Sequence, residues 1–157
     1  AFSLNVIAYD SYVAPDLAAN LGVELVSFES LLKQSDYISI HAPLTSETHH
    51  AFNADAFLKM KPEALLINTA RGALIDEQAL ASALDQDQLA GVALDVMETE
   101  PPTGDSSLLK RDNVILTPHT AFYSEEALLE LQTKAAEDVV RVLSGNQPRY
   151  PINKPPG

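Results

Sequence analysis

Three short segments concentrate the residue types that could do chemistry. Arg71 follows an apolar run, Glu100 stands before two prolines, and His119 closes the segment Leu-Thr-Pro-His. A guanidinium grips a carboxylate through two parallel hydrogen bonds, which a lysine cannot reproduce. A histidine can take or give the proton of a hydroxyl or ketone, and a carboxylate behind it fixes its tautomer and favours its charged form. The three residues could therefore bind an organic acid and move a proton on it.

Each of these residues also has a plainer interpretation. Arg71 beside a glycine could be an ordinary surface loop residue. Glu100 could be a solvated turn acid, and Glu98 is a rival for its role only two residues away. His119 after a proline could be a loop histidine with a structural hydrogen bond. The position of His119 at the end of an expected strand, with an arginine and acids at the ends of neighbouring strands, favours the functional interpretation of His119.

A metal site is a further possibility because the chain holds three other histidines, His41, His49 and His50. Adjacent residues do not share a helix face, and no carboxylate lies at a spacing typical of zinc ligands. The chain has no cysteine, which excludes disulfides, thiolate metal sites and cysteine nucleophiles. We therefore expect no metal.

The apolar runs themselves predict a parallel α/β sheet, because short segments rich in Val, Ile and Leu alternate with amphipathic stretches. Strands covered on both faces are continuously apolar, as most of these runs are. The expected strands are Asn5–Tyr9, Glu24–Val26, Tyr37–Ile40, Ala64–Asn68, Val92–Val96 and Val114–Leu116. Ligands bind at the carboxyl ends of strands in such sheets, which is where the candidate residues fall.

Helices are expected between the strands, most of them behind a residue that suits a helix N-cap. The expected helices are Asp16–Leu21, Phe28–Gln34 behind Ser27, Ala54–Met60 behind Asn53, Glu77–Leu84 behind Asp76, and Glu125–Leu143 behind Ser124. The last helix has apolar residues at helical spacing, which predicts one buried stripe: Leu128, Leu131, Ala135, Val139 and Val142. Gly145 suits the position just past its end.

The start of the chain departs from a complete doubly wound sheet. Such a sheet opens with a strand and the phosphate loop G-x-G-x-x-G, and no two of the six glycines lie close enough to form it. Asp10 ends the first expected strand, where a dinucleotide fold carries an acid for the adenosine ribose at the tip of its second strand. Asp10 could also simply cap the next turn. The pattern predicts a dinucleotide-binding sheet without its first strand and glycine loop.

The composition limits the class of protein. The chain has 157 residues, 46% of them hydrophobic, with 22 acidic and 10 basic residues for a net charge of -12. That is enough apolar material for one domain with a core, and the acidity argues against nucleic acid, which needs a basic face. No segment resembles a signal peptide, and no run approaches the roughly 18 apolar residues of a membrane helix. We expect a cytoplasmic protein with no membrane partner.

Three segments, INTARGALIDE, GVALDVMETEPP and NVILTPH, resemble the nucleotide-binding domain of the D-isomer-specific 2-hydroxyacid dehydrogenases, and the resemblance covers nearly the whole chain. Within that family, IHAPLTSETHHAFN, INTARGALIDE and PHTAFYSEEA are most similar to the C-terminal-binding corepressor branch and its bacterial relatives. That branch carries a Trp at the position of Phe122. The resemblance implies a Rossmann-like NAD-binding domain.

The resemblance also implies a role for each site residue. Arg71 would bind the substrate carboxylate, His119 would be the general acid/base, and Glu100 would pair with it. Phe122 would shape the substrate side-chain pocket. NAD would be favoured over NADP, since a 2′-phosphate would meet the charge of the ribose acid. The implied cofactor contacts are Asp10, Ala42, Pro43, Leu44, Thr48, Thr69, Ala70, Arg71, Asp95 and His119, with Asp95 on the nicotinamide carboxamide.

For the complete protein, the resemblance implies a homodimeric, NAD-dependent oxidoreductase acting on a small D-2-hydroxy acid or 2-oxo acid. Residues 1–147 would form a partial NAD-binding domain, and residues 148–157 an extended tail leading back toward a substrate domain outside this chain. Residues 1–157 alone would be inactive. Two alternatives stay open: an NAD-regulated, corepressor-like protein-binding module with the same site residues, and an unrelated doubly wound binding domain without a cofactor.

Overall fold

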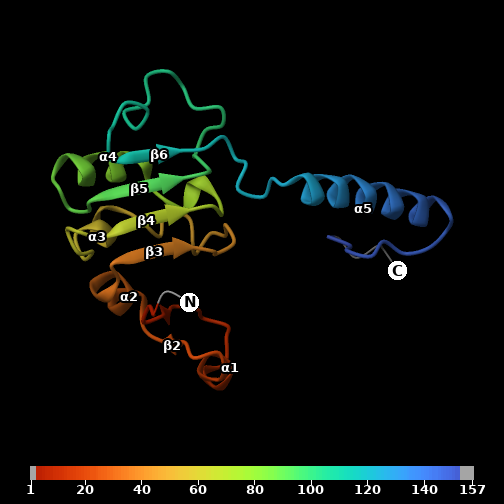
Figure 1. Ribbon diagram of the computed structural model, residues 1–157, viewed down its shortest axis with the longest axis horizontal. Helices are drawn as coiled ribbons and strands as arrows, with labels where there is room; N and C mark the ends of the chain where they lie inside the picture. Colours follow the sequence, from red (N-terminus) through yellow and green to blue (C-terminus); the bar gives the residue numbers. More distant parts are fainter. Residues whose placement is uncertain (1–2, 153–157) are drawn as a thin grey trace. The chain divides into compact units, whose positions relative to one another are not determined.

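A four-stranded parallel sheet forms the centre of the first of two units into which the chain divides (Figure 1). The computed structural model describes residues 3–152, with the units Ala1–His119 and Thr120–Gly157. The strands are paired in chain order: β3 (Tyr37–Ile40), β4 (Leu65–Asn68), β5 (Gly91–Leu94) and β6 (Val114–Leu116). This parallel sheet with flanking helices confirms the predicted fold class.

The core of this unit joins the sheet to three helices, α2 (Phe28–Gln34), α3 (Ala54–Phe57) and α4 (Glu77–Asp85). Burying one such apolar side chain contributes about 1.5–3 kcal/mol, so the core holds the strands and helices in place. The largest side chains in it that are fully buried include Leu32, Phe57, Leu66, Leu74, Leu80 and Leu89.

The helices begin at the predicted caps. The side chains of Ser27, Asn53, Asp76 and Ser124 each accept a hydrogen bond from the backbone N–H three residues later. Such a bond satisfies one of the donors that the first helical turn leaves unpaired. Helix α3 ends at Phe57 rather than at the predicted Met60, because i→i+3 bonds tighten the following turn.

A second, separate sheet holds only β1 (Ile7–Ala8) and β2 (Glu24–Leu25), with α1 (Pro15–Asn20) between them in the chain. Within residues 3–152, β1 pairs only with β2 and β3 pairs only with β4. A doubly wound sheet with strand order 3-2-1-4-5-6 would place one more strand between β1 and β3. The separation of the two sheets therefore fits the expected absence of the first strand from this chain.

The second unit consists of α5 (Glu125–Leu143) and the segment that follows it. No α5 residue is buried: Leu128 is half-buried, whereas Leu131 and Val139 are each 58% exposed. The predicted buried stripe is therefore wrong for this structure, because a single helix with a short tail offers its apolar side no core within its own unit. Gly145 follows the helix with φ of 80°, as expected for the end of a helix.

The predicted extended tail, residues 148–157, lies partly outside the described residues. No helix in the part of the chain that the structure describes is both long enough and apolar enough to cross a membrane. The division after His119 differs from the expected domain boundary at residue 147, which stays a prediction.

Residues 1–157 expressed alone should aggregate or form a molten state. β1 and β3 each carry an unpaired edge, and α5 exposes apolar side chains, both of which favour association. NAD should not bind, because the glycine loop that cradles phosphates is absent from this chain. Size-exclusion chromatography, thermal unfolding and NAD titration test this. A monomer that unfolds cooperatively and binds NAD at micromolar concentration would contradict the prediction.

Candidate active site

Backbone hydrogen bonds hold the carboxyl ends of β4, β5 and β6 together. Asp95 N–H donates to the carbonyl of Asn68 over 2.9 Å, and His119 N–H donates to the carbonyl of Asp95 over 2.9 Å. Parallel pairing runs directly up to these residues, since Asn68 is opposite Leu94 in the ladder. The loops that carry Arg71, Asp95 and His119 therefore leave the sheet side by side.

The loop with Arg71 is shaped by Asn68, which is fully buried at the end of β4. The Asn68 Oδ1 accepts the N–H of Ala70 over 3.0 Å, and its Nδ2 donates to the carbonyl of Arg71 over 2.9 Å. These bonds satisfy the buried amide, which would otherwise be costly. The Arg71 side chain is exposed and donates to the carbonyl of Ala70 over 2.6 Å. No ion pair of Arg71 occurs among the described residues, so its guanidinium is available to an anion.

Gly72 allows the loop after β5 to lie against the loop after β4. Its backbone is buried, and a Cβ at this position would come closer than 3.0 Å to the carbonyl of Met97 and to the backbone N of Glu98. Any larger residue would push the two loops apart. Arg71 and the segment that holds Glu100 are thus brought together by the lack of a side chain between them.

His119 and Glu100 form a direct pair. The His119 Nδ1 lies 2.8 Å from Glu100 Oε2, and the other Glu100 oxygen accepts the N–H of Met97 over 2.9 Å. These two hydrogen bonds, that from His119 first, hold the pKa of the Glu100 carboxyl below its ordinary value. Because the ionised Glu100 can only accept, His119 carries a proton on Nδ1, and Nε2 is left for proton exchange with a ligand.

The backbone of His119 is strained. Its φ is 55°, in the left-handed region that costs a residue other than glycine about 1–3 kcal/mol. Its N–H is bonded to the carbonyls of Asp95 and Thr117, which stabilise this conformation. Strain of this kind that is held in place by the surrounding structure is typical of functional sites.

Asp95 directly follows β5 and is only 6% exposed. Its Oδ1 accepts the hydroxyl of Thr117 over 2.5 Å, which ties the end of β5 to the segment that leads from β6 to His119. Sequence analysis missed both Thr117 and Asn68. The only signal for them was a polar residue directly at the end of an apolar strand.

The predicted cofactor residues lie on several loops. Asp10 follows β1, and its Oδ1 accepts the N–H groups of Tyr12 and Val13 over 2.7 and 2.9 Å. The turn-capping interpretation is thus confirmed for this oxygen, whereas the ribose role stays a prediction. In the loop after β3, Thr48 Oγ1 donates to the carbonyl of Pro43 over 2.7 Å and closes the 42–48 segment. Phe122 belongs to the second unit.

Within residues 3–152, no group of three or more His, Asp or Glu side chains could hold a metal ion. The rings of His49 and His50 stack with their centroids 3.9 Å apart, and His41 Nε2 lies 2.8 Å from the hydroxyl of Ser39.

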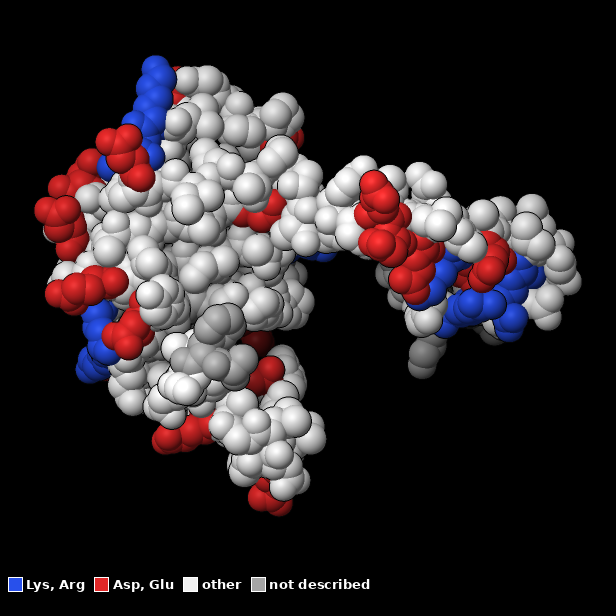
Figure 2. Space-filling view, viewed as in Figure 1, with Lys and Arg blue, Asp and Glu red and all other residues white. Residues whose placement is uncertain are grey.

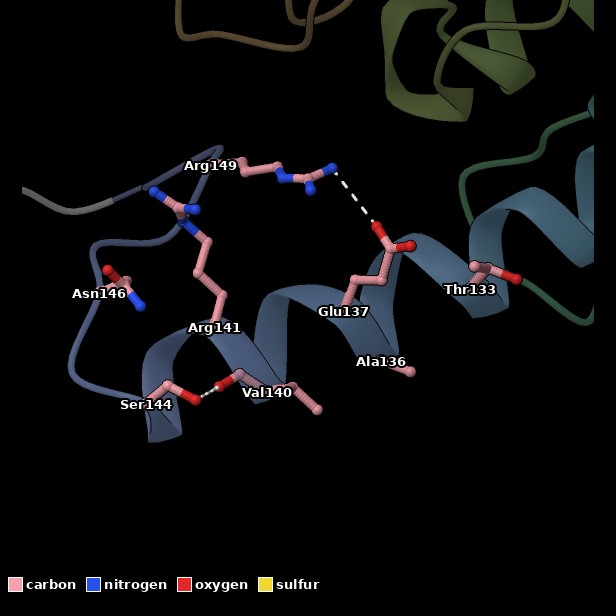
Figure 3. Close-up of a pocket in the computed structure, with 8 residues that line it drawn as sticks. All are labelled: Thr133, Ala136, Glu137, Val140, Arg141, Ser144, Asn146 and Arg149. Atoms are coloured by element: carbon pink, nitrogen blue, oxygen red, sulfur yellow. Dashed lines mark hydrogen bonds and ion pairs between the residues drawn. The ribbon is translucent and has the colours of Figure 1, made fainter.

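An open groove of about 630 Å³ lies in the second unit, and no predicted site residue lines it (Figure 3). Arg141 and Arg149 lie on one side of the end of α5, and Arg149 pairs with Glu137 over 3.4 Å. Figure 2 shows basic and acidic side chains side by side on this helix, and further acidic side chains on the visible face of the first unit. Nothing about this groove matches the predicted chemistry.

Comparison with known proteins shows which family the chain resembles. Residues 1–121 match the model of the D-isomer specific 2-hydroxyacid dehydrogenase, NAD binding domain. A D-3-phosphoglycerate dehydrogenase of Archaeoglobus fulgidus is 43% identical over 155 residues, covering 99% of this chain and 29% of the relative. A glyoxylate reductase of Korarchaeum cryptofilum is 40% identical over 162 residues, covering 99% and 49%.

Solved structures agree with this assignment. The crystal structure of D-lactate dehydrogenase with NAD⁺ from Lactobacillus jensenii matches with a TM-score of 0.83 at 28% identity, covering 96% of this chain and 48% of that one. This chain therefore spans about half, or less, of the length of the relatives it matches.

Gly72→Ala should destabilise the protein by about 3 kcal/mol, the upper end of the usual cost of overpacking, because the backbone of Met97 cannot move as easily as a side chain. Denaturant unfolding of the whole protein measures this change. Gly104→Ala is the matched control, since a Cβ there meets nothing within 4 Å. Equal stability of the two variants would show that the loops do not need this close contact.

Proposed function

Because the chain belongs to the NAD-binding domain of the D-isomer specific 2-hydroxyacid dehydrogenase family, we propose that the whole protein is an NAD-dependent oxidoreductase of D-2-hydroxy acids. It interconverts the C2 hydroxyl of a small 2-hydroxy acid and the ketone of a 2-oxo acid. The observation that carries this proposal is the 2.8 Å pair of His119 and Glu100 at the carboxyl end of the sheet.

The residues of this chain fit the cofactor. Asp10 accepts the two N–H groups of its turn through Oδ1, and its Oδ2 is the oxygen that would meet a ribose hydroxyl. The loops after β3, β4 and β5 open at the same edge of the sheet. NAD, when bound, supplies the hydride acceptor at its nicotinamide ring. The residues that would hold it are Asp10, Ala42, Pro43, Leu44, Thr48, Thr69, Ala70, Arg71, Asp95 and His119.

The chemistry of the substrate falls to three residues. His119 Nε2 takes the proton of the C2 hydroxyl during oxidation and returns it during reduction. Glu100 stabilises the imidazolium that this proton transfer forms. Arg71 binds the substrate carboxylate through its two parallel N–H bonds and polarises the developing carbonyl. The local cation matters because these 157 residues carry a net charge of -12, which repels an anionic substrate.

We also propose, from family membership, that the complete protein is a cytoplasmic homodimer and that Phe122 shapes the pocket for the substrate side chain. The corepressor-like alternative keeps the same site residues, so the site does not separate the two functions. The relatives reported above are dehydrogenases and a reductase, and they give the alternative no support.

Turnover is the direct test of the enzymatic proposal. The whole protein should oxidise NADH when given glyoxylate or a longer 2-oxo acid. His119→Ala should lower kcat by about two to four orders of magnitude, the usual contribution of a positioned acid or base. A protein that binds NADH tightly but turns over no 2-oxo acid would favour the corepressor-like alternative.

Glu100→Gln should move the pH dependence of 2-oxo acid reduction to lower pH. Reduction needs the imidazolium form of His119 as the proton donor, and the lost carboxylate no longer favours that form, so activity falls at a lower pH than in the parent protein. Glu63→Gln is the control, because it removes one exposed negative charge from the same unit. If both variants keep the parent pH profile, the pair has no part in proton transfer.

Arg71→Lys should raise KM for the 2-oxo acid and also lower kcat. An ammonium is a point charge and cannot form the planar two-bond contact, which acts on the bound substrate and on the reacting carbonyl. Steady-state kinetics at saturating NADH separates the two effects. A Lys variant with kcat/KM close to that of the parent would remove Arg71 from the carboxylate site.

A further inference from the structure

The segment Met97–Glu100 links the active-site pair to two residues that the mechanism above does not use, His50 and Glu77. It has neither helical nor strand structure, so its conformation depends on the contacts it makes. The Glu98 N–H donates to Glu77 Oε1 over 2.6 Å. The Glu98 carboxylate Oε1 lies 2.6 Å from His50 Nε2. Glu98 thus connects the segment to α4 and to the loop after β3.

Glu100 connects the same segment to His119. Met97 N–H donates to Glu100 Oε1, and Glu100 Oε2 meets His119 Nδ1. Both carboxylates of the segment are therefore paired with a histidine, Glu98 with His50 and Glu100 with His119. The ionisable groups around the segment are His50 and Glu77 near Glu98, and His119 and Asp95 near Glu100.

His50 is held in place firmly enough to act as an anchor. Its φ is 51°, in the left-handed region, and its N–H donates to the carbonyl of Ala73 over 2.9 Å. The bridge between Phe52 and Ile75 fixes the same two stretches of chain two residues further on. A strained backbone that its surroundings hold in this way is typical of functional sites.

Glu77 supports the same arrangement from the first turn of α4. Burial raises the pKa of its carboxyl, and the hydrogen bond from Glu98 N–H opposes this effect. A half-buried carboxyl group costs free energy unless it is hydrogen-bonded, and Glu98 N–H supplies such a bond. The contact therefore stabilises both the start of α4 and the segment.

We propose that His50 is a positioning residue that, by pairing with Glu98, leaves Glu100 as the carboxylate partner of His119. Glu98 and Glu100 are only two residues apart on an irregular segment, so without an anchor either could turn toward the imidazole. The pair with His50 occupies Glu98 and fixes the segment, so that Glu100 is already oriented when proton transfer begins. The kinetic consequences rest on the proposed function, whereas the placement of Glu100 does not.

Two variants of His50 separate its contact with Glu98 from its backbone role. Asparagine tolerates a positive φ, but its amide is too short to reach Glu98 as the imidazole does. The longer amide of His50→Gln can still donate to the Glu98 carboxylate. His50→Asn should lower kcat for 2-oxo acid reduction by about three- to tenfold, the usual range for coupled neighbours, and His50→Gln should restore most of it.

The pH profile distinguishes positioning from a general loss of structure. In the whole protein, His50→Asn should move the pH dependence of reduction to lower pH, in the same direction as Glu100→Gln. In a Glu100→Gln background it should add no further shift, because the carboxylate that it positions is gone. Glu29→Gln is the control, since it breaks an exposed pair with Lys33 elsewhere in the same unit. A His50→Asn variant that loses thermal stability but keeps the parent pH profile would overturn the proposal.

An NMR measurement tests the inference without relying on turnover. The hydrogen-bonded Nδ1 proton of His119 should give a low-field signal in the whole protein, and this signal should be lost in Glu100→Gln. His50→Asn should weaken it, and His50→Gln should preserve it. An unchanged signal in His50→Asn would overturn the inference even for a protein that turns over no 2-oxo acid, whereas failure of turnover with these signal changes would overturn only the proposed enzymatic function.

Discussion

The in-register pairing of β4, β5 and β6 is the constraint on which the site depends. Parallel strands end at one edge, and the backbone bonds from Asp95 to Asn68 and from His119 to Asp95 extend this alignment into the loops. The core beneath the sheet, with Leu66 fully buried, stabilises the alignment. Residues far apart in the chain, such as Arg71 and His119, therefore emerge from neighbouring strands of a rigid frame, which is what a preorganised site requires.

Close contact between loops adds a second level of order to this frame. Gly72 lets the segment after β5 lie on the loop after β4, and the segment then presents two carboxylates to two histidines. Glu98 meets His50 and Glu100 meets His119, so each acid of the segment has its own histidine partner. Pairing each acid with its own base is a way to choose one orientation of an irregular segment, since the segment has no ladder of backbone bonds to do so.

The negative charge of the chain makes a local cation necessary at the site, and a buried amide holds the loop that carries this cation. These 157 residues carry a net charge of -12, which repels the anionic substrate proposed above. Arg71 offers an exposed guanidinium at the one edge where the loops converge. Its position comes from Asn68, a fully buried amide that uses both of its ends on the loop backbone. A buried polar side chain and an exposed charged one thus act as a unit.

The sequence alone determined the features that depend on neighbours in the chain: the parallel strands, the caps at Ser27, Asn53, Asp76 and Ser124, and Arg71 and His119 at strand ends. Apolar periodicity, capping and motifs are local, so they can be recognised without a fold. Only the tertiary structure decided that Glu98 meets His50, why Gly72 must be glycine, and that the apolar stripe of α5 is exposed rather than buried within its own unit. These outcomes depend on which segments pack together, because a hydrogen bond or a buried contact between residues 19 or more apart is set by the path of the whole chain.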